Sequence, residues 1–195
     1  MPKNKHMAAL VLTSENQIQR LNHILNTVKK HQTLDLTTLK TPPNPQAWNI
    51  VEVIAHLNIA YGKYVEKIND ALAKSADIEK ESEGFKARRW QKFVFEGQRP
   101  KNGVRKMKMK TMKRFEPLLD KTELTEEKID EVFDEFFDLH NHFKQSILKS
   151  RNKDVTKIKI TSAIGPIVKF YLPEAFEFLL CHLERHMVQI DEILA

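Results

Sequence analysis

Apolar residues recur at steps of three and four in four separate segments of this chain, and this periodicity limits the folds open to it. The stripe between residues 48 and 74 is the clearest, with Ile50, Val53, Ile54, Leu57, Tyr61, Tyr64, Ile68 and Leu72. Such spacing gathers apolar side chains on one face of an α-helix, whereas a half-buried strand alternates them. Gly is also scarce, at five of 195 residues. We therefore predict an all-α protein with helices near 14–31, 48–74, 125–150 and 173–194.

Capping signals indicate where two of these helices begin. Residues 14–17, Ser-Glu-Asn-Gln, have the pattern of a capping box. Asn49 can cap the second helix, and Glu52 follows three residues later, as a second capping box requires. Four amphipathic helices joined by two long connections predict a four-helix bundle of antiparallel type with long crossover connections. We expect residues 1–195 to form this single domain.

The net charge of +6 has one source. Residues 86–114 contain twelve Lys or Arg and one acid, a local charge of +11, while the remainder has 20 basic and 25 acidic residues. This segment belongs to a connecting arm of about 84–117, which we interpret as packed along the bundle. Within it, residues 106–110 alternate Lys and Met as an extended strand does.

The arm permits two interpretations. Trp90, Phe93 and Phe95 lie among Arg and Lys residues, a mixture that suits stacking on nucleic-acid bases. Alternatively, the arm is a solvated loop whose aromatic side chains attach it to the bundle. We favour the solvated loop, because runs of charge are usually solvated, and we do not expect a nucleic-acid partner.

Composition excludes several classes of protein. No apolar run approaches the 18 residues that a membrane-spanning helix needs, so we expect no membrane association. The short apolar patch at residues 7–12 is followed by no small-residue cleavage site, which argues against a secretory signal. The single cysteine, Cys181, cannot form an internal disulfide. These features predict a cytoplasmic protein.

Three histidines are the main candidates for chemistry. His182 and His186 are four residues apart, so both side chains leave the same face of a helix and can reach one metal ion. That face also carries apolar residues and should point into the bundle. His56 lies at the flank of the apolar stripe of the second helix. Buried imidazoles need partners, so the residues alone leave open a metal site or a set of hydrogen-bonded core histidines.

Other polar residues are weaker candidates. We expect His140 to be a satisfied core histidine, Cys181 to be core, and Gln189 to extend the stripe of His182 and His186 toward the site. Glu52, one turn before His56, can either orient that ring or only cap its helix. We predict surface positions for His6, His23 and His31.

Two motifs resemble those of the DinB/YfiT-like superfamily, a family of damage-inducible metal-binding proteins. Trp48-Asn-Ile-Val-Glu-Val-Ile-Ala-His-Leu57 is similar to its stretch W-S-x-x-E-x-x-x-H-L, and His182-Leu-Glu-Arg-His-Met-Val-Gln-Ile190 to its C-terminal H-x-x-R-H-x-x-Q-I. Gly165-Pro166 matches the usual approach to the second motif. This sequence departs from the family in having Asn49 where Ser is common and in its basic connection, and neither departure affects a ligand.

The resemblance implies a four-helix bundle, often a homodimer, with one divalent metal held by His56, His182 and His186. Zn and Ni are the ions we expect, although imidazole suits Cu and Fe as well and the sequence does not distinguish among the four. Some relatives conjugate low-molecular-weight thiols to electrophiles, and others are described as hydrolases. The implied function is thus a metal-dependent, thiol-dependent S-transferase or hydrolase acting on a small molecule, with no catalytic residue identified. A non-catalytic metal-binding stress-response bundle and, less favoured, a nucleic-acid-binding protein are the alternatives.

Overall fold

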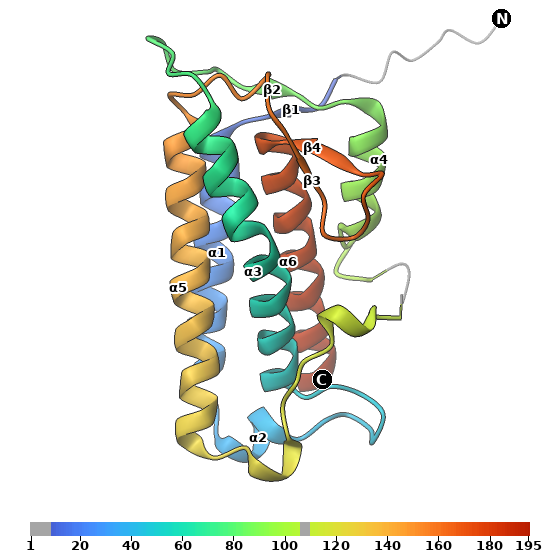
Figure 1. The fold of residues 1–195 in the computed structure, drawn as a ribbon. Coiled ribbons are helices and arrows are strands. Elements are labelled where there is room, and N and C mark those ends of the chain that lie inside the picture. The colour runs from blue at the N-terminus through green and yellow to red at the C-terminus, as the bar shows by residue number, and fades with distance from the viewer. Residues whose placement is uncertain (1–8, 106–109) are drawn as a thin grey trace, which may run out of the picture.

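Four long helices form a bundle in the computed structural model, which describes residues 9–105 and 110–195. They are α1 (Ser14–Gln32), α3 (Ile50–Lys74), α5 (Glu126–Ser150) and α6 (Leu172–Leu194) (Figure 1). Each begins and ends within two residues of the predicted bounds. The all-α prediction is confirmed.

The helix directions differ from a simple antiparallel bundle. α1 and α6 run one way and α3 and α5 the other, so the neighbours α3 and α5 are parallel (Figure 1). An isolated bridge between Asp77 and Lys153 joins the chain just beyond their C-terminal ends. The physical reason is the long connection after α3, which returns along the bundle before α5 begins.

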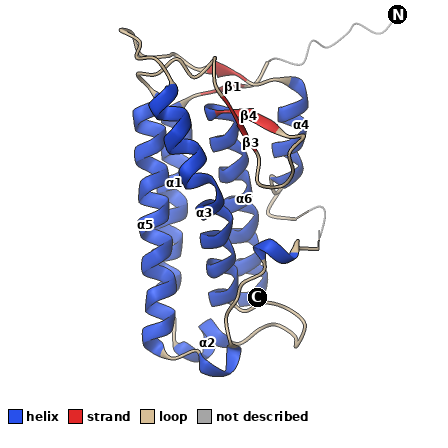
Figure 2. Ribbon diagram, viewed as in Figure 1, coloured by secondary structure: helices blue, strands red, loops and turns tan. Residues whose placement is uncertain are grey.

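Short elements complete the fold. β1 (Val11–Leu12) pairs with β2 (Phe85–Lys86), and β3 (Lys159–Thr161) pairs with β4 (Lys169–Tyr171), both antiparallel. Figure 2 shows these strands at the end of the bundle where α6 begins. Further short elements are α2 (Leu36–Lys40) and the 3-10 turns η1 (Lys113–Phe115) and η2 (Lys121–Glu123).

One predicted cap is confirmed and one is wrong. The Asn49 side chain accepts from the Glu52 amide, and the Glu52 carboxylate accepts from the Asn49 amide, each at 2.9 Å. At α1, however, Thr13 is the cap, and its hydroxyl accepts from the backbone of Asn16. Gln17 cannot complete a box there, because its buried amide donates instead to the Pro173 carbonyl at 2.9 Å.

The connecting arm contains a helix that sequence reasoning missed, α4 (Arg89–Gln98), which packs against α6. Phe95 is fully buried and attaches α4 to the core, as the solvated-loop interpretation required. Trp90 and Phe93 do not, since they are 57% and 70% exposed and stack on each other with centroids 5.7 Å apart. Most of the predicted strand at 106–110 lies outside the described residues.

The core lies between the four long helices and is rich in fully buried aromatic rings, including Phe133, Phe136, Phe143 and Phe176. Within the described ranges, no helix has the length and apolarity needed to cross a membrane. The packing of α3 against α6 matters most for the site, because each of these helices contributes histidines to the space between them.

Candidate metal centre

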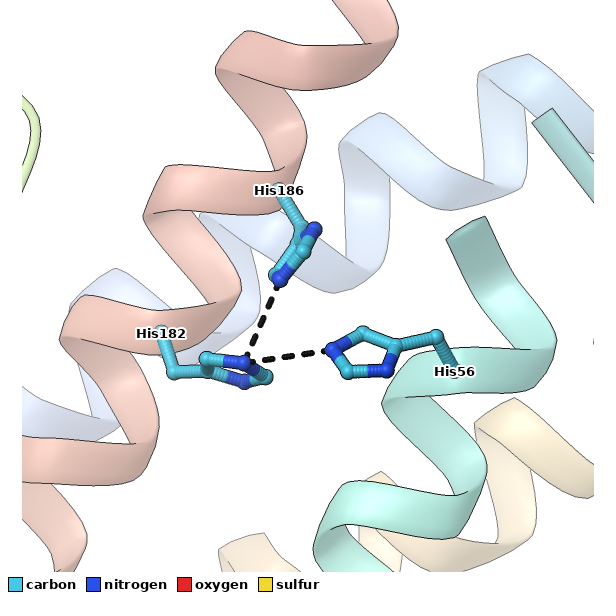
Figure 3. Close-up of side chains that lie close together, drawn as sticks. All are labelled: His56, His182 and His186. Atoms are coloured by element: carbon cyan, nitrogen blue, oxygen red, sulfur yellow. Dashed lines mark hydrogen bonds between the residues drawn. The ribbon is translucent and has the colours of Figure 1, made fainter. Parts of the chain in front are cut away.

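His56, His182 and His186 converge on one point between α3 and α6, with their rings directed toward one another (Figure 3). The Nε2 atom of His182 lies 3.3 Å from that of His56 and 3.2 Å from that of His186. A ligand nitrogen from each residue lies within 4.8 Å of the other two. The i, i+4 spacing on α6 brings two of the rings together, and helix packing delivers the third.

Hydrogen bonds determine which nitrogen carries the proton in the rings of His56 and His186. The Nδ1 atom of His56 lies 2.7 Å from the Phe115 carbonyl, and that of His186 lies 2.9 Å from Gln189 Oε1. Both oxygens can only accept, so each Nδ1 is the donor. Arg105 also donates to Gln189 Oε1 at 2.8 Å, which supports its assignment as the oxygen. The Nε2 atoms of His56 and His186 therefore present lone pairs to the centre of the cluster.

Burial keeps these rings neutral. It lowers the pKa of His182 to about 3, assisted by the nearby charge of His56 and then of Arg185. Burial likewise lowers the pKa of His186 well below its usual value, followed by the effects of His182 and His56. The pKa of His56 is lowered by burial as well, in spite of its bond to Phe115. At neutral pH all three rings are therefore uncharged, as metal ligation requires.

The donor set fits a divalent ion. Zinc–nitrogen bonds of about 2.0–2.1 Å in a tetrahedral arrangement separate the ligand nitrogens by roughly 3.3 Å. The two short nitrogen–nitrogen distances here, 3.3 and 3.2 Å, match that separation. The Nε2 atoms of His56 and His186 both carry lone pairs, so neither can donate a hydrogen bond to the other. A cation therefore satisfies the three nitrogens better than hydrogen bonds among them do. The alternative of a purely hydrogen-bonded set of core histidines is correspondingly disfavoured.

A cavity of about 340 Å³ opens beside the three nitrogens. Apolar side chains form much of its wall, and the Trp48 ring lies with its centroid 5.0 Å from that of His56. The connection between α3 and α5 closes one side through Met112 and Phe115. The cavity therefore provides room for a small molecule directly at the candidate metal centre.

Several secondary predictions can be compared with the structure. Gln189 borders the site, as expected, and holds the ring of His186. Glu52 does not orient His56, because its carboxylate accepts from Asn49 and pairs with Lys121 at 3.0 Å. Its role is the cap.

The remaining predictions concern residues away from the cavity. Cys181 is buried, and burial raises the pKa of its thiol, as suits a core residue. His140 is a core residue as predicted, with Nδ1 bonded to the Phe136 carbonyl at 2.7 Å, but it is not fully satisfied, since its Nε2 has no hydrogen-bond partner among the described residues. His23 is exposed as predicted, whereas His31 is buried against expectation, because it follows Val28 by three residues and continues the buried face of α1. His6 lies outside the described residues.

Two contributors to the site were not foreseen from the sequence. Phe115 acts through its backbone carbonyl, which any residue type supplies, so no sequence signal marks it. Arg105 lies in a run of basic residues that we interpreted as solvated, yet its side chain is only 13% exposed. Only the path of the connection over the cavity distinguishes it from its neighbours.

Comparison with known proteins adds one finding. The model of the DinB superfamily matches residues 16–190, a range that includes all three histidines. No curated protein and no solved structure matches the chain.

Proposed function

The chain belongs to the DinB superfamily, and from this we propose that it is a divalent-metal-dependent enzyme acting on a small molecule. The proposed metal ligands are His56, His182 and His186, with Zn or Ni as the ion. The proposed reaction is the transfer of a low-molecular-weight thiol to an electrophile, with hydrolysis as the related second reaction.

The single observation that carries this proposal is the convergence of three Nε2 atoms at the wall of a cavity. Three protein ligands are typical of catalytic zinc sites, whereas structural sites usually have four. When bound, such an ion supplies a Lewis acid that makes a thiol or water nucleophilic near neutral pH. The Phe115 carbonyl and Gln189 Oε1 fix the orientations of the His56 and His186 rings, and thereby the directions in which their Nε2 atoms would meet the ion.

The cavity wall favours the thiol over water as the nucleophile. No Asp or Glu lines the cavity within the described residues, so no carboxylate is placed to act as a general base. The Tyr64 hydroxyl is engaged by Ser162 at 2.6 Å and by the Ala163 amide at 3.0 Å, and burial raises its pKa. A thiol, with an ordinary pKa of about 8.5, needs far less assistance than water to ionise.

The wall also suits an organic substrate. Phe178 and Leu179 on α6 and Ala60 and Tyr64 on α3 line the cavity, with Ile164 from the loop before β4. These side chains can hold the apolar part of an electrophile and exclude water from the reacting atoms. The protein's own contribution is therefore binding, orientation and the exclusion of water.

A non-catalytic metal-binding bundle is the second candidate. It is supported by the same absence of a carboxylate from the cavity wall in the described ranges. It predicts the same metal content but no turnover. The two candidates therefore separate on activity and not on metal binding.

The test combines metal content with turnover. The purified protein is loaded with Zn²⁺ or Ni²⁺ and assayed with monochlorobimane as electrophile and cysteine, coenzyme A or glutathione as thiol. We expect one thiol to be conjugated faster by the loaded protein than by the metal-free protein. His182→Ala should lose both the metal and the activity, while His23→Ala, an exposed position on α1, should keep both.

The outcomes are distinct. Stoichiometric metal without conjugation of any thiol and without hydrolysis of p-nitrophenyl acetate supports the non-catalytic bundle. Failure of the wild-type protein to bind a divalent ion contradicts both candidates.

A further inference from the structure

Three cationic side chains line the cavity at the candidate metal centre. They are Arg105 and Lys110 from the basic connection and Arg185 from α6. No carboxylate accompanies them on the wall in the part of the chain that the structure describes. A small cavity with charge of only one sign selects a ligand of the opposite sign.

Arg105 is held firmly in position. Its guanidinium donates to Gln189 Oε1 at 2.8 Å and to the Glu192 carboxylate at 3.1 and 2.5 Å. Gln189 in turn holds the ring of His186. Arg105 is thus pre-oriented beside a proposed metal ligand, which lowers the entropic cost of binding a ligand there.

Arg185 lies between the two histidines of α6 in sequence and is 5% exposed. Its side chain lines the same cavity as that of Arg105, so two guanidinium groups contribute to one wall. Glu192 offsets part of this charge from outside the wall, with a side chain 40% exposed. Lys110 adds a third positive charge, at an exposed position.

We propose that the substrate of this cavity is a small organic anion, bound with its carboxylate or phosphate group against Arg105, Arg185 and Lys110. This inference rests on the proposed function and specifies its substrate class. Guanidinium and ammonium groups donate charge-assisted hydrogen bonds to such oxyanions. The apolar remainder of the ligand packs against Trp48 and Phe178.

The shape of the cavity explains why the ligand is a small molecule. A volume of about 340 Å³ lies at the lower end of the range for small-molecule sites. A nucleic-acid strand needs an open groove, and Arg89, which lies on the exposed face of α4, does not line the cavity. Arg89 therefore lies apart from the three cations that line the cavity.

The test uses three probes of similar size. Isothermal titration calorimetry measures the binding of 3-phenylpropionate, phenyl phosphate and the uncharged 3-phenylpropanamide to metal-free protein. Because the protein is metal-free, a preference for the anions cannot come from coordination of the oxyanion by the metal. We expect at least one anion to bind about tenfold more tightly than the amide, as a charge-assisted hydrogen bond provides. The anion that does so shows whether the site selects carboxylate or phosphate.

Variants identify the residues responsible. Arg185→Gln and Lys110→Gln should each weaken anion binding several-fold and leave amide binding unchanged. Lys110 is exposed, so Lys110→Gln should fold and can test the proposal even if Arg185→Gln does not fold. Arg89→Gln is the matched control on the same connection and should change nothing. Equal affinity for anions and amide, no binding of any probe, or an equal loss in Arg89→Gln would overturn the proposal.

The result is separable from the proposed function. Preference for anions in a protein that binds no divalent ion refutes the metal-dependent enzyme and leaves the anion site standing. Metal-dependent thiol conjugation without any preference for anions refutes the anion site and leaves the metal-dependent enzyme standing.

Discussion

The Nδ1 atom of His56 donates a hydrogen bond of 2.7 Å to the carbonyl oxygen of Phe115, a residue 59 positions later in the chain. Phe115 ends the turn η1 in the connection between α3 and α5. The same connection supplies Arg105, which supports the ring of His186 through Gln189. Two of the three proposed ligands are therefore oriented by one segment that passes over the cavity.

The first prediction concerns the metal ligands. Replacing His56, His182 or His186 with Ala should each abolish tight zinc binding, because two imidazoles do not complete the site. His140→Ala should retain it, since His140 Nδ1 is bonded to the Phe136 carbonyl within its own helix. Zinc stoichiometry by elemental analysis after gel filtration is the measurement. Loss of zinc in His140→Ala with a native circular dichroism spectrum would contradict the assignment.

The second prediction concerns the support of His186 by Gln189. Gln189→Leu removes the acceptor for the Nδ1 proton, while Gln189→Glu retains an oxygen at that position. Loss of such a supporting group typically costs about 10–100-fold in metal affinity. Competition with a fluorescent zinc chelator should show that loss for the Leu variant and a much smaller change for the Glu variant. Equal affinities in the two variants would show that the hydrogen bond does not position the ring.

The third prediction concerns stability. A ligand that binds only the folded state adds RT ln(1 + [L]/Kd), about 4 kcal/mol at a free concentration 1,000 times Kd. Zinc should therefore raise the melting temperature of the wild-type protein, and a chelator should reverse the increase. His182→Ala should melt at the same temperature with and without zinc. A similar increase in that variant would place the bound zinc elsewhere.

The fourth prediction concerns acid and His140. Burial lowers the pKa of this ring to about 4. The unfolded chain takes up a proton below about pH 6.5, which the folded state resists until near pH 4. The contribution of His140 to stability is therefore complete above pH 6.5 and is lost as the pH falls toward 4.

This loss amounts to about 1.4 kcal/mol per pH unit for one group. Urea unfolding of metal-free protein between pH 7 and 4.5 should show a shallower pH dependence in His140→Gln than in the wild type. His23→Gln, at an exposed position, is the control and should keep the wild-type slope. An unchanged slope in His140→Gln would show that the ring titrates normally in the folded state.

Local sequence determined the helices and part of the site. The bounds of the four long helices follow from apolar periodicity and from caps such as Asn49, because both depend on residues within one or two turns. The proximity of His182 and His186 was predictable for the same reason, since four residues on a helix correspond to about one turn. The short helix α4 was missed because its outward face carries Trp90 and Phe93 and its inward face is only partly apolar.

Tertiary structure decided what completes the site. The position of His56 depends on the packing of α3 against α6, and the family resemblance anticipated it where periodicity alone could not. The Phe115 carbonyl and the Arg105 guanidinium reach their partners only because the connection crosses the cavity, and neither contact has a local signal. A histidine's distance from its neighbours along a helix is fixed by backbone geometry, whereas its protonated nitrogen and its open face are fixed by whichever distant groups pack against it.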